Sequence, residues 1–212
     1  MSARDDILEA ADRLFGERGF DATTTREIAA ACRVNKALIH YHFANKGTLF
    51  GAVLDRYYEH LEAALREALR EKGSVRDRLW HALDVYTDFL AANGNFSRLI
   101  QREVAGGAHV ERIIASMVPI FATGVDMLRQ HYPATSKGAL SGAQLLISFY
   151  GMVVSYFTYS PVLEGLLAEP PLSSRSLQQR KRHLHRMFDL AVDALEAGAT
   201  RPQRRIRKGA RR

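Results

Sequence analysis

The sequence predicts an all-α protein, and two observations carry this prediction. Apolar side chains recur three and four residues apart in nearly every segment, which is the spacing of one helix face. No segment shows the alternation of apolar and polar residues that marks a half-buried strand. With 212 residues, 47% of them hydrophobic and 25% charged, the chain can bury a core and has the composition of a folded protein.

The segment DDILEAADRLFGERGF predicts the first helix. It places Ile7, Ala11, Leu14 and Phe15 on one face. Its first turn is acidic, which favours a helix start because acids oppose the positive end of the helix dipole. Gly19 favours its end.

Two short helices follow. Thr24 and Glu27 have the spacing of a capping box, in which each side chain accepts a hydrogen bond from the backbone N–H of the other residue. The second helix then runs to about Cys32, RVN forms a short break, and KALIHYHF forms the third helix over residues 36–43. Asn45 is the expected N-cap of the fourth helix.

The rest of the chain predicts longer helices. The fourth is expected from Lys46 to about Lys72, and a fifth opens at Ser74, where Asp77 completes a second capping box. Further helices are expected over residues 96–105, 109–131, 137–168 and 174–197.

We expect three parts: an N-terminal three-helix domain (1–47), a larger helical domain (48–200) and a basic tail (201–212). The tail, RPQRRIRKGARR, holds seven of the 30 Lys and Arg residues and no acid. The remaining 23 basic residues balance the 23 acidic ones, although the whole chain has a net charge of +7. Any DNA-binding prediction for the body therefore depends on where its charges lie. The tail is expected to be disordered and to add only non-specific affinity for phosphate.

The cysteine content and the charges of the N-terminal residues indicate the cellular compartment of the protein. Cys32 is the single cysteine, which leaves no pair for an intramolecular disulfide and suits a reducing compartment. The N-terminal residues are charged where a signal peptide would be apolar, so we expect a cytoplasmic protein.

Residues 138–163 carry no formal charge over a length that could span a bilayer. Small and polar side chains recur through them, which favours a helix buried in protein over a membrane span.

Residues 23–50, TTTREIAAACRVNKALIHYHFANKGTLF, are typical of a helix-turn-helix, with two short helices and a brief break between them. One face of the third helix is formed by Lys36, Ala37, His40 and Tyr41. Ile39 and Phe43 point the opposite way and can pack on the first two helices. From Thr24 onward the stretch has four basic residues and only Glu27 as an acid. The pattern therefore predicts a positive surface that can meet DNA.

The same stretch resembles the N-terminal signature of the TetR/AcrR family of transcriptional regulators. The Thr-Thr-Arg start of the second helix, the Tyr-His-Phe end of the third and the following Asn-Lys are specific in combination. The resemblance covers about the first fifty residues, and the remainder shares only its helical character and length. It implies a ligand-responsive repressor that binds a palindromic double-stranded DNA operator as a homodimer, without a cofactor.

The resemblance also assigns DNA-binding roles, and the chemistry agrees, because lysine can reach guanine edges or phosphates while tyrosine and histidine can donate to phosphates. The expected contacts are Thr25 and Arg26 at the head of the second helix, Lys36, Ala37 and Leu38 at the tip of the recognition helix, and Tyr41, His42 and Lys46 as clamps on the DNA backbone. His40 is kept as a contact, although the family commonly has tyrosine there. Gly47 stands where glutamate is frequent.

An apolar pocket for a small-molecule inducer is implied in the larger domain. The available aromatic and methionine side chains are Trp80, Tyr86, Phe89, Phe96, Met117, Phe121, Phe149 and Met152. Each of these can equally serve as core.

A dimer interface is expected from the two C-terminal helices. The helix over residues 137–168 carries a seam of small and polar residues: Ser141, Gln144, Ser148, Gly151, Ser155 and Thr158. The last helix offers Leu184, Met187, Phe188, Ala191 and Leu195. We expect both to join a homodimeric four-helix bundle, as in the family. The alternative is that both helices simply fill the core of the monomer.

Enzyme and metal sites are not expected. The sequence has no zinc-protease, serine-hydrolase or phosphate-loop motif. His40 and His42 project about 200° apart on a helix, which disfavours a shared metal ion. The rival hypothesis is a non-enzymatic helical binding or scaffold protein whose Arg-rich tail alone touches nucleic acid.

Overall fold

The computed structural model describes residues 2–199 and confirms the all-α fold, with no strand in that range. The prediction for the tail, residues 201–212, lies outside the described residues. The helices are α1 (Ala3–Arg18), α2 (Thr25–Ala31), α3 (Lys36–Phe43), α4 (Lys46–Arg70), α5 (Val75–Ala92), α6 (Gly94–Val104), α7 (Val110–His131), the 3-10 turn η1 (Pro133–Ser136), α8 (Gly142–Thr158), α9 (Ser160–Leu163) and α10 (Ser174–Ala199).

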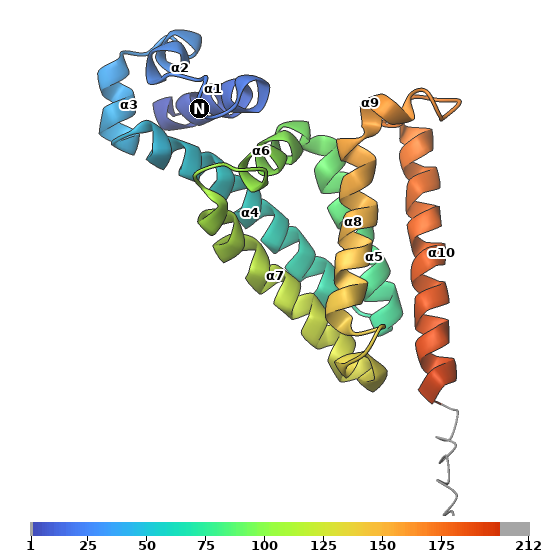
Figure 1. Cartoon of the computed structure of the whole chain (residues 1–212). Helices are drawn as coiled ribbons and strands as arrows, with labels where there is room; N and C mark the ends of the chain where they lie inside the picture. Colours follow the sequence, from blue (N-terminus) through green and yellow to red (C-terminus); the bar gives the residue numbers. More distant parts are fainter. Residues whose placement is uncertain (1, 200–212) are drawn as a thin grey trace, which may run out of the picture.

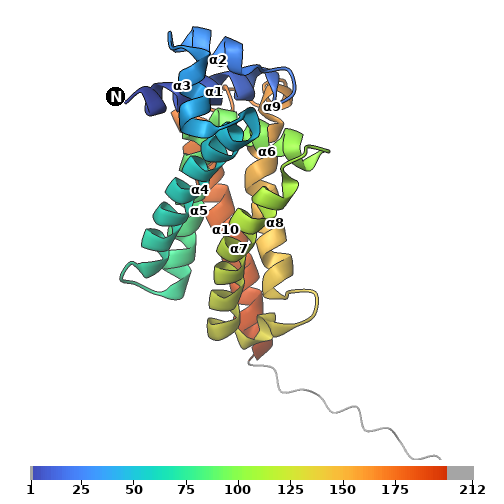
Figure 2. The ribbon, with the colours of Figure 1, turned by 90° about the vertical axis from the view of Figure 1, so that its left-hand side faces the viewer.

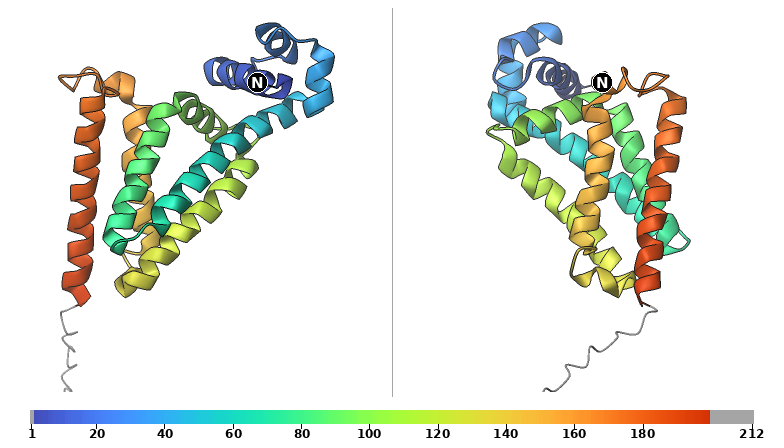
Figure 3. Two further views of the ribbon diagram at one scale, coloured as in Figure 1. Left: turned by 180° about the vertical axis from the view of Figure 1, so that it is seen from behind. Right: turned by 45° about the vertical axis from the view of Figure 1, so that its right-hand side comes forward.

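The first three helices form a group that lies across the N-terminal end of α4 (Figures 1 and 2). From this group α4 runs into the larger part, where it packs against α5 and α7. Along the flank farthest from α3, α8 and α10 run side by side (Figures 1 and 3). The fold therefore places α3 at one outer edge and the α8 and α10 flank at the other.

Side-chain caps begin the helices of the N-terminal group. The Thr24 hydroxyl accepts from the N–H of Glu27 at 3.2 Å, and the Glu27 carboxylate accepts from the N–H of Thr24 at 2.8 Å, which confirms the capping box. Asn45 Oδ1 accepts from the N–H of Thr48 at 2.9 Å and confirms the N-cap of α4. The second predicted capping box opens α5. Because these bonds satisfy N–H groups that the helix itself leaves unpaired, local sequence sets where the helices start.

The single helix predicted over residues 137–168 is wrong. Gly138 has a φ of +87°, a conformation that favours glycine, and α8 begins only at Gly142. At the other end α8 stops before Tyr159, and Pro161 lies in the separate four-residue helix α9. Proline has no N–H to donate to the preceding turn, so it cannot continue α8. Among the helices of residues 2–199, none has the length and hydropathy needed to cross a membrane.

One buried cluster joins the two parts of the chain. It contains Ile28 and Ile39 from the N-terminal group, Phe50 and Leu54 from α4, and Leu99 from α6. The first half of α4 therefore packs with both parts. A displacement of α4 in the larger part must consequently be felt by the helices that carry α3.

Candidate nucleic-acid interface and apolar cavity

The turn between α2 and α3 fixes the direction of α3. At the end of α2, Arg33 donates its N–H to the Ala30 carbonyl at 3.3 Å and Val34 donates to the Ala29 carbonyl at 3.0 Å, which together form a Schellman motif. Arg33 takes a φ of +56°, the left-handed conformation that such motifs require. Asn35 then accepts from a backbone N–H in the first turn of α3 at 3.0 Å. The start of α3 is thus held from both sides.

The predicted two faces of α3 are confirmed. Ile39 and Phe43 are buried in the core. The exposed face comprises Lys36, Ala37, His40 and Tyr41. Tyr41 exposes 82% of its surface, and its ring meets the His42 ring edge-on with 5.1 Å between centroids. Leu38 is half-buried and packs against the core, so only part of it faces outward.

His40 is tied back to the end of α3. Its Nδ1 lies 2.8 Å from the Ala44 carbonyl oxygen, so Nδ1 carries a hydrogen and donates it. Ala44 has a φ of +58° and ends the helix. His40 therefore caps α3 and keeps Nε2 for an outside partner.

Lys46 is also held within the chain. Its Nζ donates to the Phe20 carbonyl at 2.9 Å and lies 4.2 Å from the centroid of the Phe20 ring. These contacts tie the start of α4 to the loop after α1. Lys46 was expected to clamp DNA directly, but the structure gives it a positioning role that leaves fewer of its three N–H donors for a phosphate.

Glu27, the acid in the first turn of α2, is paired with other residues of the chain. The hydrogen bonds from Thr24, followed by the nearby charge of Arg18, hold the pKa of Glu27 below its ordinary value. Arg18 Nη1 lies 3.0 Å from the Glu27 carboxylate. Thr25 is half-buried and Arg26 is exposed. Because Glu27 is already paired, Arg26 keeps its positive charge for a partner outside the chain.

Two arginines that were not among the predicted DNA contacts lie close to α3. Arg33 is exposed at the turn before it. The Arg4 guanidinium lies 5.4 Å from the centroid of the Phe43 ring. Arg33 could have been chosen as one of the four basic residues of the stretch. The position of Arg4 beside α3 could not be predicted from the sequence, because it depends on how α1 crosses α3.

Arg102 of α6 joins the N-terminal group to the larger part. Its guanidinium donates to the carbonyl oxygens of Phe15, Gly16 and Glu17 at 3.3–3.4 Å, where α1 ends. A cation at this place opposes the negative end of the α1 dipole. Nothing in the local sequence pattern predicted this contact, because it joins residues more than eighty positions apart.

A second junction is aromatic. The His109 ring lies 4.5 Å from the Phe20 ring and 4.7 Å from the Phe50 ring, measured between centroids. The buried Glu103 carboxylate lies 3.1 Å from His109 Nδ1 and also accepts from the His109 backbone N–H. The loop between α6 and α7 thereby rests on the ring of Phe20, the residue whose carbonyl binds Lys46.

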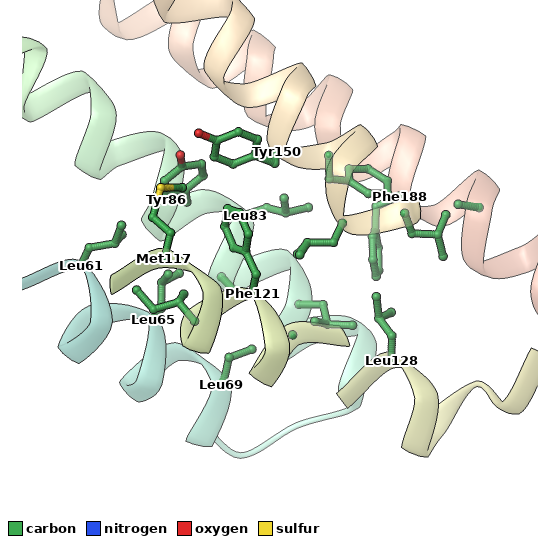
Figure 4. Close-up of a pocket in the computed structure, with 18 of the residues that line it drawn as sticks. Leu61, Leu65, Leu69, Leu83, Tyr86, Met117, Phe121, Leu128, Tyr150 and Phe188 are labelled. Atoms are coloured by element: carbon green, nitrogen blue, oxygen red, sulfur yellow. The ribbon is translucent and has the colours of Figure 1, made fainter. Parts of the chain in front are cut away.

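An apolar cavity with a volume of about 160 Å³ lies inside the larger part (Figure 4). Its lining comes from α4, α5, α6, α7, α8 and α10: Leu61, Leu65, Leu69, Leu79, Ala82, Leu83, Tyr86, Phe96, Ile100, Met117, Ile120, Phe121, Gly124, Leu128, Leu145, Leu146, Phe149, Tyr150, Phe188, Ala191, Val192 and Leu195. The structure therefore places a chamber of small-molecule size where these six helices meet.

The predicted pocket residues divide between lining and core. The lining includes Tyr86, Phe96, Met117, Phe121 and Phe149. Trp80, Phe89 and Met152 do not belong to it. Trp80 stacks on the His185 ring at 5.1 Å, and Phe89 packs edge-on against Phe96 at 5.2 Å. Met152 packs against the main core cluster. Residue type alone could not separate the two sets.

The flank formed by α8 and α10 has an apolar outer surface. The small and polar seam of α8 faces outward, with Gln144, Ser148, Gly151 and Ser155 exposed. Ile147 beside the seam is exposed, as are Met187 and Leu190 on α10. The expected contribution of Leu184, Phe188 and Leu195 to an interface is wrong, because all three are buried within the monomer.

These features define a helix-turn-helix DNA-binding protein with a second, cavity-containing helical part. Residues 7–53 match the family model described as bacterial regulatory proteins, tetR family. The transcriptional repressor Rv3405c of Mycobacterium tuberculosis is 33% identical over 172 residues, which cover 81% of either chain. The transcriptional activator FasR of Mycolicibacterium smegmatis is 36% identical over 97 residues, which cover 46% of this chain and 44% of FasR.

Solved structures agree on the fold. The TetR-family regulator PfmR of Thermus thermophilus has a TM-score of 0.68 at 20% identity, with 90% of this chain and 96% of PfmR covered. A TetR-family regulator from Bordetella parapertussis has a TM-score of 0.71 at 19% identity, with 87% and 93% covered. The chain belongs to the TetR family, and it is a DNA-binding transcriptional regulator.

Proposed function

We propose that the protein is a homodimeric repressor that binds a palindromic operator and is released by a small apolar inducer. The observation that carries this proposal is the outer face of α3, where Tyr41 exposes 82% of its surface while the opposite face is buried in the core. Such a helix can enter a major groove without disturbing its own packing. A dimer places two copies of α3 in successive grooves of a two-fold symmetric site.

The proposed contacts sort by chemistry. Base edges are read by Lys36, Ala37 and Leu38, and the phosphates are met by Thr25, Arg26, His40, Tyr41, His42 and Lys46. Within this set Tyr41 and Lys36 are exposed, and Lys46 acts mainly by holding α4 to Phe20. We also propose that residues 1–47 act as the DNA-binding domain and residues 48–200 as the ligand-binding and dimerisation domain.

The dimer is proposed to form through the α8 and α10 flank. Exposed apolar side chains gather there, and Gly151 leaves open space where a Cβ would stand, so a second helix can approach closely. Met187 and Leu190 supply apolar contacts from α10. Sedimentation of the wild-type chain at micromolar concentration should show a dimer, and Gly151→Arg should yield a monomer.

Repression rather than activation is supported by the longer of the two reported matches. The relative named as a repressor aligns over 81% of its length, whereas the relative named as an activator aligns over 44%. A reporter gene placed downstream of the selected operator tests whether the protein represses or activates transcription. Expression should rise when the protein is deleted, and a fall would show activation.

The inducer is proposed to act through α4. This helix carries Leu61 and Leu65 in the cavity lining and begins at Lys46, beside the end of α3. A ligand that favours one placement of α4 therefore favours one spacing between the two α3 helices of a dimer. The mechanism needs no covalent chemistry and fits a cytoplasmic protein.

The test begins by selecting bound DNA from a random pool with the full chain. Lys36→Ala should weaken binding to the selected site by about 1–3 kcal/mol. Lys72→Ala removes another exposed lysine, outside the helix-turn-helix, and serves as the matched control. Equal affinities of the two variants would refute the assignment of α3.

Deleting residues 201–212 distinguishes DNA binding by the α3 surface from the rival hypothesis, a scaffold protein whose tail alone touches nucleic acid. Sequence-specific binding that survives the deletion supports the α3 surface. Complete loss of binding would instead assign nucleic-acid contact to the tail.

A further inference from the structure

The cavity has one polar end. Among its described lining residues, side-chain oxygens come only from Tyr86 and Tyr150, whose rings stack with 6.1 Å between centroids. Both hydroxyls lie at the end near Met117 and Leu61, away from Leu128 (Figure 4). The remainder of the lining is hydrocarbon, aromatic ring and one thioether. A bound molecule would therefore meet hydrogen-bonding groups at one end only.

A third buried hydroxyl, that of Tyr58, lies outside the lining but interacts electrostatically with Tyr150 and Tyr86. Tyr58 of α4 is 4% exposed, and its hydroxyl has no hydrogen-bond partner within residues 2–199. Burial, followed by the neighbouring Tyr150, raises the pKa of Tyr58, and burial followed by Tyr150 and Tyr58 raises the pKa of Tyr86. Burial also raises the pKa of Tyr150, so all three hydroxyls keep their protons at neutral pH and can donate hydrogen bonds. An unpartnered buried hydroxyl is costly, which favours a ligand that supplies an acceptor nearby.

The lining cannot neutralise an ion. No residue of the lining within the described part of the chain has a charged side chain. A carboxylate or an ammonium group brought into this chamber would lose its hydration without gaining an opposite charge. A ketone, ester or hydroxyl oxygen loses far less on burial and can accept from tyrosine.

We propose that the cavity selects an uncharged, mainly apolar ligand with a single hydrogen-bonding oxygen, which the hydroxyls of Tyr86, Tyr150 and Tyr58 receive. The volume of about 160 Å³ is close to that of a cavity that holds benzene, so a fitting probe has roughly six to ten non-hydrogen atoms. This inference deepens the proposed function, because it names the chemical class of the inducer.

The test compares three probes of equal chain length by calorimetry on the full chain: 2-octanone, octanoate and octylammonium. At pH 7.5 we expect 2-octanone to bind and both ions to bind at least about tenfold more weakly. Octanoate or octylammonium binding as tightly as the ketone would overturn the proposal. So would the absence of 2-octanone binding up to its solubility limit.

Tyrosine variants locate the oxygen of the ligand. Tyr86→Phe and Tyr150→Phe should each weaken 2-octanone binding by about threefold to tenfold, because each removes one neutral hydrogen bond. Tyr159→Phe changes an exposed tyrosine outside the lining and should leave affinity unchanged. Wild-type affinity in both cavity variants and in their double variant would overturn the proposed polar end. If a variant fails to fold, the comparison of the three probes on the wild-type chain decides the matter.

The measurement is separable from the proposed function because it uses no DNA. If 2-octanone binds without releasing the operator, the ligand class holds and the inducer hypothesis fails. If octanoate binds and releases the operator, the inducer hypothesis holds and the ligand class fails.

Discussion

The α3 surface and the apolar cavity are opposites in chemistry and in how the chain builds them. The α3 surface is polar, exposed and assembled from residues close together in sequence. The cavity is uncharged along its described lining and is assembled from six helices that span the chain from Leu61 to Leu195. Between them lies the first half of α4, packed in one cluster with both parts. We therefore expect substitutions on the α3 surface to leave folding intact and substitutions at the α4 junction to destabilise the fold.

The largest effect is expected at that junction. Phe50→Ala removes a fully buried ring that meets the rings of Phe15, Phe20 and His109. We expect the free energy of unfolding to fall by about 3–5 kcal/mol in urea titrations, because a cavity replaces the ring. A loss below about 1 kcal/mol would show that α4 is not the structural link described above.

The α3 surface should behave in the opposite way. Tyr41→Ala should weaken binding to the selected operator by about 1–3 kcal/mol. Its free energy of unfolding should stay within about 0.5 kcal/mol of wild type, because the side chain is exposed. Quantitative gel-shift and urea titrations measure the two effects on the same preparation. Destabilisation equal to that of Phe50→Ala would erase the distinction between the two regions.

A smaller effect is expected at the polar junction. Arg102→Gln removes the charge that caps the carbonyl end of α1 and should lower the free energy of unfolding by about 1–2 kcal/mol. Arg98→Gln is the matched control, since Arg98 is also an exposed arginine of α6 but donates to Asn95 of its own helix. Equal free energies of unfolding for the two variants would show that Arg102 of α6 does not stabilise the contact with the end of α1.

The smallest effect concerns the caps. Thr24→Ala should cost about 1 kcal/mol of stability. The pKa of Glu27 is lowered in the folded state, so its stabilising contribution is present above its ordinary pKa of 4.5 and is lost as pH falls through the lower folded value. Melting temperatures measured from pH 7 down to pH 3 should therefore fall less steeply for Glu27→Gln than for wild type. Parallel curves would contradict the role of the Glu27 carboxylate.

The same contrast explains what the sequence could predict. Thr24, Asn45 and Ser74 cap their helices through residues three positions away, so local spacing was sufficient. The face of α3 followed from helical periodicity for the same reason. Arg33 was harder, because a non-glycine residue in a left-handed turn gives no compositional signal.

Contacts between residues far apart in the sequence could not be predicted from local patterns. Trp80 was expected in the pocket, but it stacks on His185 of α10, more than one hundred residues away. The polar end of the cavity was missed because neither Tyr150, which lines it, nor Tyr58, which interacts electrostatically with Tyr150, was among the predicted pocket residues. The long helix expected over residues 137–168 failed because its uncharged composition concealed the turn at Gly138 and the stop before Pro161.

The central claim is that two copies of the α3 surface read the operator. Hydroxyl-radical footprinting of the selected operator with the full chain tests it most directly. We expect two protected segments whose centres lie one helical turn, or a whole number of turns, apart, with about 10–10.5 bp per turn. Both segments should weaken together in Tyr41→Ala and remain in the chain without residues 201–212. A single protected segment, or a footprint that survives Tyr41→Ala and vanishes when residues 201–212 are deleted, would contradict reading of the operator by two α3 surfaces.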